Sequence, residues 1–180
     1  MTAPARADLA RAGALAFADA LAAQAQAEPA AAAPDPQLHL IAFRLDREEY
    51  GVPVATVREV SRVGDITRVP QAPAHIRGVT NLRGRILPVY EIRTRLGLEP
   101  LAPGPKARVV VAEVHGRVLG LLVDAVAQVL KVPADCVVAP PEETRSAQAD
   151  YVTGVAQLDG RLIILLDLER MLQPGSVPQP

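Results

Sequence analysis

The sequence predicts an all-β fold, a barrel or sandwich made of two similar units, and three observations support this prediction. One pattern occurs twice, because residues 50–60 and 119–129 share one glycine and three valines in register. A second pattern follows in the same order, since residues 78–86 are matched by residues 154–162. Short β-branched runs with glycine turns between them are typical of strands. Two patterns repeated in the same order indicate a tandem duplication packed about an approximate twofold axis.

This duplication makes a specific structural prediction. Residues of about 38–100 and 106–165 should form two superposable β units, in which equivalent hydrophobic positions occupy the same places. These positions are Val54, Val57, Val79 and Leu82 in the first unit and Val123, Val126, Val155 and Leu158 in the second. The alternative is a chance match, since either pattern alone would be weak and valine is common in the chain.

Hairpin turns are the clearest local signals. Asp159-Gly160 lies between apolar runs and predicts a two-residue type I′ turn, because such a turn requires positive φ angles that Asp-Gly can adopt. The same context recurs at Arg83-Gly84 and His115-Gly116. We therefore expect a β-hairpin at each of these three places.

Connections and helices follow from proline, glycine and charge. Residues 97–105 contain too much proline and glycine for a central strand, so they should connect the two units. The polar stretch 140–150 is typical of a surface loop. Two short helices are expected, over residues 91–96 and 167–172, the second with Asp167 placed favourably at its N-terminus.

The N-terminal segment differs in composition from the rest of the chain. Residues 1–36 hold 17 alanines and predict a flexible tail, or a weakly amphipathic helix over residues 8–27 that could bind a partner. Charged residues interrupt this segment, which argues against a secretory signal peptide. Residues 173–180 are expected to be a disordered tail. We expect no direct membrane insertion, because no stretch approaches the roughly 20 apolar residues that a membrane span requires.

Few residues suggest catalysis. The three histidines and the single Cys136 are scattered without metal-ligand spacing, and no phosphate-binding loop, dinucleotide fingerprint or nucleophile elbow is present. We therefore expect no catalytic residue, no metal and no cofactor. One cysteine cannot form an internal disulfide, which fits a reducing cytoplasm.

Arginine is concentrated in one part of the chain. Residues 58–95 contain eight arginines and three acidic residues, although the net charge of the whole chain is −1. A small β-barrel that binds nucleic acid through arginine-rich hairpins is therefore the alternative function. Scattered aromatics and the absence of adjacent basic residues argue against it, so we expect no nucleic-acid partner and a protein interface instead.

One segment carries a family resemblance. Residues 74–89, Ala-His-Ile-Arg-Gly-Val-Thr-Asn-Leu-Arg-Gly-Arg-Ile-Leu-Pro-Val, resemble the signature of the CheW family of chemotaxis coupling proteins. Residues 49–52, 57–60 and 162–172 also match, so the resemblance covers residues 38–172. His75 and Tyr90-Glu91 depart from residues more usual at those positions.

The resemblance implies a CheW-like domain over residues 37–172, made of two interlocked five-stranded SH3-like barrels with short helices. Barrel one would span about 38–100 and barrel two about 106–165. Members of the family are non-catalytic cytoplasmic adaptors recruited to membrane-associated receptor arrays. Their partners are the regulatory domain of a CheA-type histidine kinase and the cytoplasmic tip of methyl-accepting chemoreceptors. Flagellar and surface motility both remain open as the process served.

The resemblance also implies two sets of site residues. Kinase binding is expected at Val57, Glu59 and Arg83. Val57 and Glu59 would share one face of a strand, and we expect Arg83 to pair with Glu59, because its duplicate in the second hairpin is Asp159.

Receptor binding is expected in a groove between the barrels, at Gly78, Val109 and Val110. Gly78 would let backbone approach closely there, and the two valines would supply apolar contact. Whether the valines are contact or core residues stays open.

Overall fold

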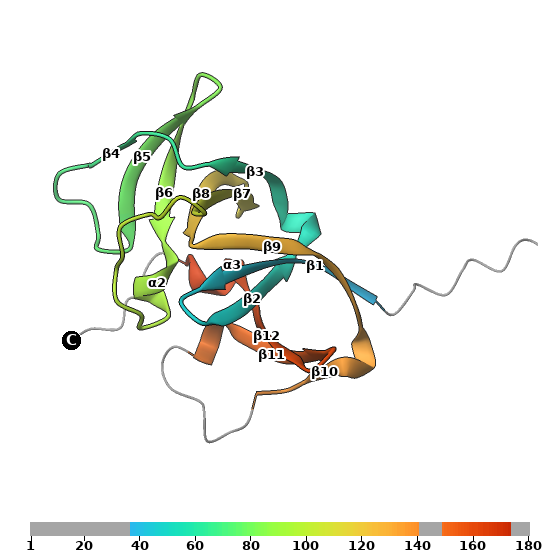
Figure 1. Ribbon diagram of the computed structural model, residues 1–180. Helices are drawn as coiled ribbons and strands as arrows, with labels where there is room; N and C mark the ends of the chain where they lie inside the picture. The colour runs from blue at the N-terminus through green and yellow to red at the C-terminus, as the bar shows by residue number, and fades with distance from the viewer. Residues whose placement is uncertain (1–36, 141–148, 174–180) are drawn as a thin grey trace, which may run out of the picture. The chain divides into compact units, whose positions relative to one another are not determined.

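The computed structural model describes residues 37–140 and 149–173 (Figure 1). The predictions for residues 1–36, for most of the loop 140–150 and for residues 174–180 therefore lie outside the described residues. The strands are β1 (Gln37–Leu45), β2 (Glu48–Pro53), β3 (Val57–Arg62), β4 (Ile66–Thr67), β5 (Ile76–Leu82), β6 (Arg85–Glu91), β7 (Arg108–Val114), β8 (Arg117–Val123), β9 (Ala125–Pro133), β10 (Val137–Val138), β11 (Val152–Leu158) and β12 (Arg161–Leu166). The helices are α2 (Ile92–Arg95) and α3 (Leu168–Met171), with 3₁₀ turns η1 (Val54–Thr56), η2 (Ala134–Cys136) and η4 (Ala149–Tyr151).

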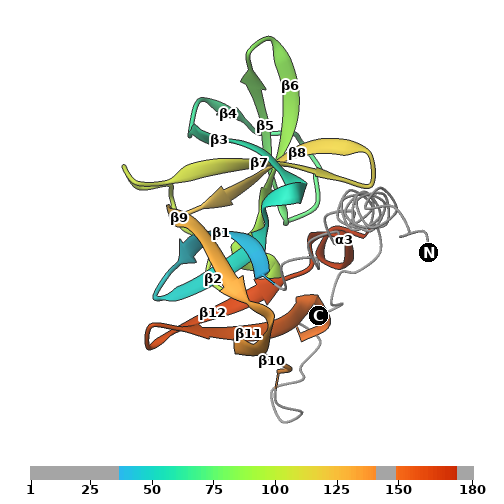
Figure 2. The same cartoon turned by 90° about the vertical axis from the view of Figure 1, so that its right-hand side faces the viewer.

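These strands form two sheets, which confirms the all-β fold class. Sheet A has the order β10-β11-β12-β2-β1-β9, and sheet B has the order β3-β7-β8-β6-β5-β4. Each sheet contains five longer strands and one strand of only two residues, β10 in sheet A and β4 in sheet B. Figure 2 shows the two sheets one above the other.

The sheets do not correspond to the two halves of the sequence. Sheet A combines β1 and β2 with β9–β12, and sheet B combines β3–β6 with β7 and β8. The expectation that residues 38–100 and 106–165 each form a complete barrel is therefore wrong: each repeat donates its first hairpin to the sheet of the other. The exchange is made through parallel pairs, β2 with β12 and β8 with β6.

The duplication itself is confirmed by strand order and register. Exchanging β1–β6 with β7–β12 converts the order of sheet A into that of sheet B. At the parallel pairs, Gly51 lies opposite Leu165 just as its duplicate Gly120 lies opposite Val89.

Three of the four expected pairs of equivalent positions have matching partners across the sheets. They are Val57 with Val126, Val79 with Val155, and Leu82 with Leu158. The fourth pair differs, because Val54 lies in the 3₁₀ turn η1 whereas Val123 ends strand β8.

Local structure follows the turn and helix signals closely. Arg83, His115 and Asp159 have φ angles of 52°, 51° and 50°, and the glycine after each is also positive, as a type I′ turn requires. Helix α3 begins after Asp167, whose carboxylate accepts a hydrogen bond from the Arg170 backbone N–H at 3.1 Å. Both short helices lie where they were predicted, and residues 98–104 connect the repeats without strand or helix.

Three hydrophobic cores hold the fold together. Each sheet has one core formed by its own strands, around Val132 and Ile163 in sheet A and around Val89 and Val109 in sheet B. The third and largest is shared between the sheets, and it is built mainly from the two exchanged hairpins: Phe43, Leu45, Tyr50 and Val52 from β1–β2, and Val110, Ala112, Leu119 and Leu121 from β7–β8. The strand exchange thus places the principal apolar interface between the two repeats.

Candidate interaction surfaces

The predicted pair of Glu59 and Arg83 is present. Arg83 Nη2 lies 3.1 Å from Glu59 Oε2, and the two side chains are 82% and 27% exposed. Glu59 comes from β3, at one edge of sheet B, and Arg83 from the β5–β6 turn. The ion pair therefore joins two segments that the order of sheet B separates.

Val57 does not share a face with Glu59, and this part of the kinase-site prediction is wrong. Val57 lies opposite Ala112 and Glu59 opposite Val111, so Arg58 is an extra residue in β3. A bulge of this kind shifts the alternation of side chains by one residue. Since Ala112 and Val111 point to opposite faces of β7, so do Val57 and Glu59.

Glu59 and Arg83 border a pocket of about 300 Å³ on sheet B. Its apolar lining includes Leu87 and Val111, which are nearly fully buried. Its charged lining consists of Arg58, Glu59, Arg83 and Arg85. The surface predicted for kinase binding is thus a small basic pocket with an apolar floor, in which Arg58 and Arg85 were not foreseen.

Val57 lies at the junction of the two sheets. Together with Val54 and Val126 it is partly buried and packs against the shared core. Val57 and Val126 are duplicates of one another, so the two repeats contribute equivalent valines to this junction. Half-exposed apolar side chains of this kind can contact a partner and the core together.

Val109 and Val110 are core residues, which corrects their assignment to a receptor-binding surface. Val109 is 2% exposed and packs inside sheet B, whereas Val110 is fully buried in the shared core. They also point to opposite faces of β7, because adjacent residues of a strand alternate. A single partner cannot contact both side chains.

Gly78 has a structural role within sheet B. A Cβ atom built there would lie 2.3 Å from the carbonyl oxygen of Thr67, so only glycine allows the edge strand β4 to approach β5 this closely. Its duplicate, Gly154, lies beside the edge strand β10 in the same way, because a Cβ atom built there would lie 3.1 Å from the carbonyl oxygen of Val138. The close approach predicted for Gly78 is real, but the approaching backbone belongs to the chain itself.

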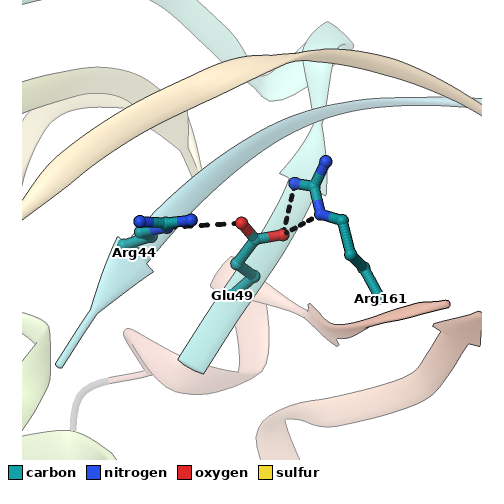
Figure 3. A network of polar contacts seen from close by, with 3 residues as sticks. All are labelled: Arg44, Glu49 and Arg161. Carbon is teal, nitrogen blue, oxygen red and sulfur yellow. Dashed lines mark hydrogen bonds and ion pairs between the residues drawn. The ribbon is translucent and has the colours of Figure 1, made fainter. Parts of the chain in front are cut away.

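A second polar cluster, on sheet A, was not predicted from the sequence. Figure 3 shows Glu49 between Arg44 and Arg161. Glu49 Oε2 accepts hydrogen bonds from Arg161 Nε at 3.1 Å and Nη2 at 2.5 Å, and Glu49 Oε1 accepts one from Arg44 Nε at 3.3 Å. Burial would raise the pKa of Glu49, but the hydrogen bonds and charges of Arg161 and Arg44 hold it below its ordinary value of 4.5.

Half of the arginines in the arginine-rich stretch form ion pairs within the protein. Four of its eight arginines pair with carboxylates: Arg58 with Glu113, Arg77 with Glu91, Arg83 with Glu59, and Arg93 with Asp124. The charge available for phosphate contacts is correspondingly reduced, so the nucleic-acid alternative gains no support from the structure.

Neither a metal-binding cluster nor a membrane-spanning helix occurs among the residues that the structure describes. Within residues 37–140 and 149–173, no group of three or more His, Cys, Asp or Glu side chains is placed to hold a metal ion. In the same part of the chain, no helix has the length and apolar character needed to cross a membrane.

Comparison with known proteins agrees with this architecture. The family model for the CheW-like domain matches residues 39–175. The probable chemotaxis protein CheW of Rhizobium etli is 37% identical over 132 residues, covering 73% of this chain and 85% of the relative. Protein FrzA of Myxococcus xanthus is 33% identical over 145 residues, covering 79% and 90%.

A solved structure is also similar. The crystal structure of the scaffolding protein TtCheW from Thermoanaerobacter tengcongensis matches with a TM-score of 0.70 and 31% identity, covering 78% of this chain and 96% of that one. The match in family model, sequence and structure shows that this chain belongs to the CheW-like domain family and is a chemotaxis coupling adaptor of the CheW type.

Proposed function

We propose that this adaptor links the cytoplasmic tip of methyl-accepting chemoreceptors to the regulatory domain of a CheA-type histidine kinase. It does so without catalysis, as a scaffold recruited to membrane-associated receptor arrays. Family membership supports this role. The observation that carries the kinase contact is the ion pair between Glu59 and Arg83 beside the pocket of sheet B.

The ion pair suits a binding surface more than a stabilising role. Arg83 is 82% exposed, so the pair contributes little to folding, on the order of 0–1 kcal/mol. The arginine is also not required by the turn, since the duplicate turn has Asp159 at the same position. Fixing one exposed arginine against one carboxylate orders the rim of an apolar pocket, which favours a defined protein partner.

The receptor contact is proposed at a different place, the junction of the two sheets. Val54, Val57 and Val126 are half-exposed there against the shared core. This replaces Val109 and Val110, whose side chains are buried. Separate surfaces would let one adaptor hold both partners together, as coupling requires.

Charge reversal tests the kinase contact. Glu59→Arg and Arg83→Glu should each weaken binding of the kinase regulatory domain about tenfold or more, and the double reversal should restore part of the loss. Asp159→Arg is the matched control, because it changes the equivalent turn residue of the second hairpin. Binding to kinase and to receptor is measured by calorimetry on the full chain, with thermal melting alongside.

The expected pattern is loss of kinase binding with receptor binding, melting temperature and the control unchanged. Wild-type binding by both single variants would contradict the proposed kinase surface. Losses that simply add in the double variant would contradict a role for the pair. A wild-type chain that binds neither partner would contradict the coupling function itself.

A further inference from the structure

The two sheets differ at one pair of duplicated arginines, Arg85 and Arg161. Each is the first residue after its hairpin turn, where Arg85 lies opposite Leu82 and Arg161 opposite Leu158. Arg161 forms the ion pair with Glu49 through two nitrogen atoms. The strands around the two arginines are duplicates. Comparing the contacts of Arg161 with those of Arg85 therefore shows which contact is missing in sheet B.

The residue equivalent to Glu49 in sheet B is Val118. Glu49 precedes Gly51 by two residues in β2 and lies opposite Arg44, whereas Val118 precedes Gly120 by two residues in β8 and lies opposite Glu113. Valine cannot accept a hydrogen bond from arginine. Glu113, the duplicate of Arg44, is instead paired with Arg58.

Arg85 is therefore left without a carboxylate from the part of the chain that the structure describes. Among residues 37–140 and 149–173, Arg58 and Arg83 have carboxylate partners, Glu113 and Glu59, and Arg85 has none. All three arginines line the pocket of about 300 Å³. With Glu59 as the acidic residue of that lining, the pocket carries excess positive charge over an apolar floor.

These features match one acidic side chain of a protein better than a small free anion. A guanidinium group binds carboxylate oxygens through a planar fork of N–H donors, as Arg161 does here, and the apolar lining suits the methylene groups of aspartate or glutamate.

We propose that the pocket of sheet B is a carboxylate-binding subsite in which Arg85 binds an aspartate or glutamate side chain of the kinase regulatory domain. That side chain takes the place which Glu49 occupies beside Arg161. This inference rests on the proposed kinase-binding function of the same face, and it identifies Arg85 and Val118 as determinants of partner specificity.

Two kinds of variant test the subsite: one removes the arginine, and the other gives the arginine a carboxylate partner from the chain itself. Arg85→Ala should weaken binding of the kinase regulatory domain about tenfold, the size expected for losing one charge-assisted hydrogen bond. Val118→Glu places a carboxylate at the position in sheet B that Glu49 holds in sheet A. This carboxylate should pair with Arg85 in place of the partner's side chain, and so weaken kinase binding at least as much. Arg62→Ala, an exposed arginine of β3 outside the pocket lining, is the matched control.

Calorimetry at two salt concentrations and thermal melting of each full-length variant give the readouts. We expect Arg85→Ala to melt like wild type and to bind with a smaller salt dependence, since it removes a charge from the interface. Val118→Glu should stay folded, because its new carboxylate has a partner. Rescue of kinase binding by Arg85→Lys to within about threefold would support a charge contact.

Several results would overturn the subsite. Wild-type affinity for the kinase in both Arg85→Ala and Val118→Glu would contradict it. A loss of kinase binding in Arg85→Ala no greater than that in the Arg62→Ala control would also contradict it. If the variants changed self-association, measured by sedimentation, but still bound the kinase, the carboxylate would come from a second copy of the chain. That result would overturn the proposal that the kinase supplies it. Failure of wild type itself to bind the kinase would contradict the proposed function, which is a distinguishable result.

Discussion

Glu49 shows how a buried acid is tolerated in this fold. The side chain is 9% exposed, yet three hydrogen bonds from two arginines satisfy both of its oxygens. Removing an arginine would leave the buried Glu49 carboxylate with fewer hydrogen-bond donors, which destabilises the folded state. The two arginines remain substantially exposed, so solvent screening moderates the effect.

The lowered pKa of Glu49 predicts how stability depends on pH. Its folded-state pKa lies below the ordinary 4.5, so its contribution is complete above that pH and is lost as the pH falls through the folded-state value. Glu49→Gln should lower the free energy of unfolding by about 1–2 kcal/mol at pH 7. The difference from wild type should shrink below about pH 4.5.

Urea unfolding at a series of pH values measures this difference. Asp65→Asn, which changes an exposed carboxylate, is the control and should leave the profile unchanged. A difference between wild type and Glu49→Gln that stays constant from pH 7 to pH 3 would show that ionisation of Glu49 does not stabilise the fold.

At the scale of strands, two irregularities shape sheet B. The bulge at Arg58 turns Glu59 toward the pocket, and Gly78 lets the edge strand β4 lie close beside β5. Both have duplicates in sheet A, at Ala127 in β9 and at Gly154 in β11. Because both irregularities occur in both sheets, they are structural features of the fold and are not specific to one binding surface.

The strand packing at Gly78 predicts a large effect of a single methyl group. Gly78→Ala should destabilise the protein by more than about 2 kcal/mol, because the added Cβ clashes with the Thr67 carbonyl and the φ of +154° is unfavourable for alanine. Gly104→Ala is the matched control: no heavy atom lies within 4 Å of its added Cβ, so stability should change by less than about 0.5 kcal/mol.

Denaturant midpoints of the two glycine variants provide the measurement. Equal stability of Gly78→Ala and Gly104→Ala would mean that β4 can move away from β5 at little cost. In that case the short distance between β4 and β5 would have to be explained by binding rather than by packing.

At the scale of the whole molecule, strand exchange makes the two repeats interdependent. Residues 1–101 contain β1–β6 but lack β7 and β8, which lie between β3 and β6 in sheet B. Residues 102–180 likewise lack the β1–β2 hairpin that sheet A requires between β9 and β12. Each fragment alone would expose the residues that it contributes to the shared core.

We therefore expect neither fragment to unfold cooperatively when expressed alone, whereas an equimolar mixture should recover a folded complex. An isolated hairpin is marginal in water, but strand donation from a second chain can complete a sheet. Circular dichroism and amide NMR spectra of each fragment and of the mixture measure this. A dispersed spectrum from residues 1–101 alone would show that the first repeat folds without the exchange.

The sequence by itself determined the features that depend on neighbouring residues. The type I′ turns, the helix cap at Asp167 and the connection between the repeats follow from local φ preferences and hydrogen bonds. The pair of Glu59 and Arg83 was also predictable, because the duplicate turn with Asp159 showed that arginine was not needed for the turn.

Only the tertiary structure decided which strands pair across the repeats. Either hairpin can extend either sheet with the same local pattern, so the exchange depends on the burial of a core shared by residues distant in the chain. The same holds for Glu49 and Arg161, which are 112 residues apart. The bulge at Arg58 separated Val57 from Glu59 for a related reason: one extra residue reverses a strand's faces, and only pairing with β7 reveals it.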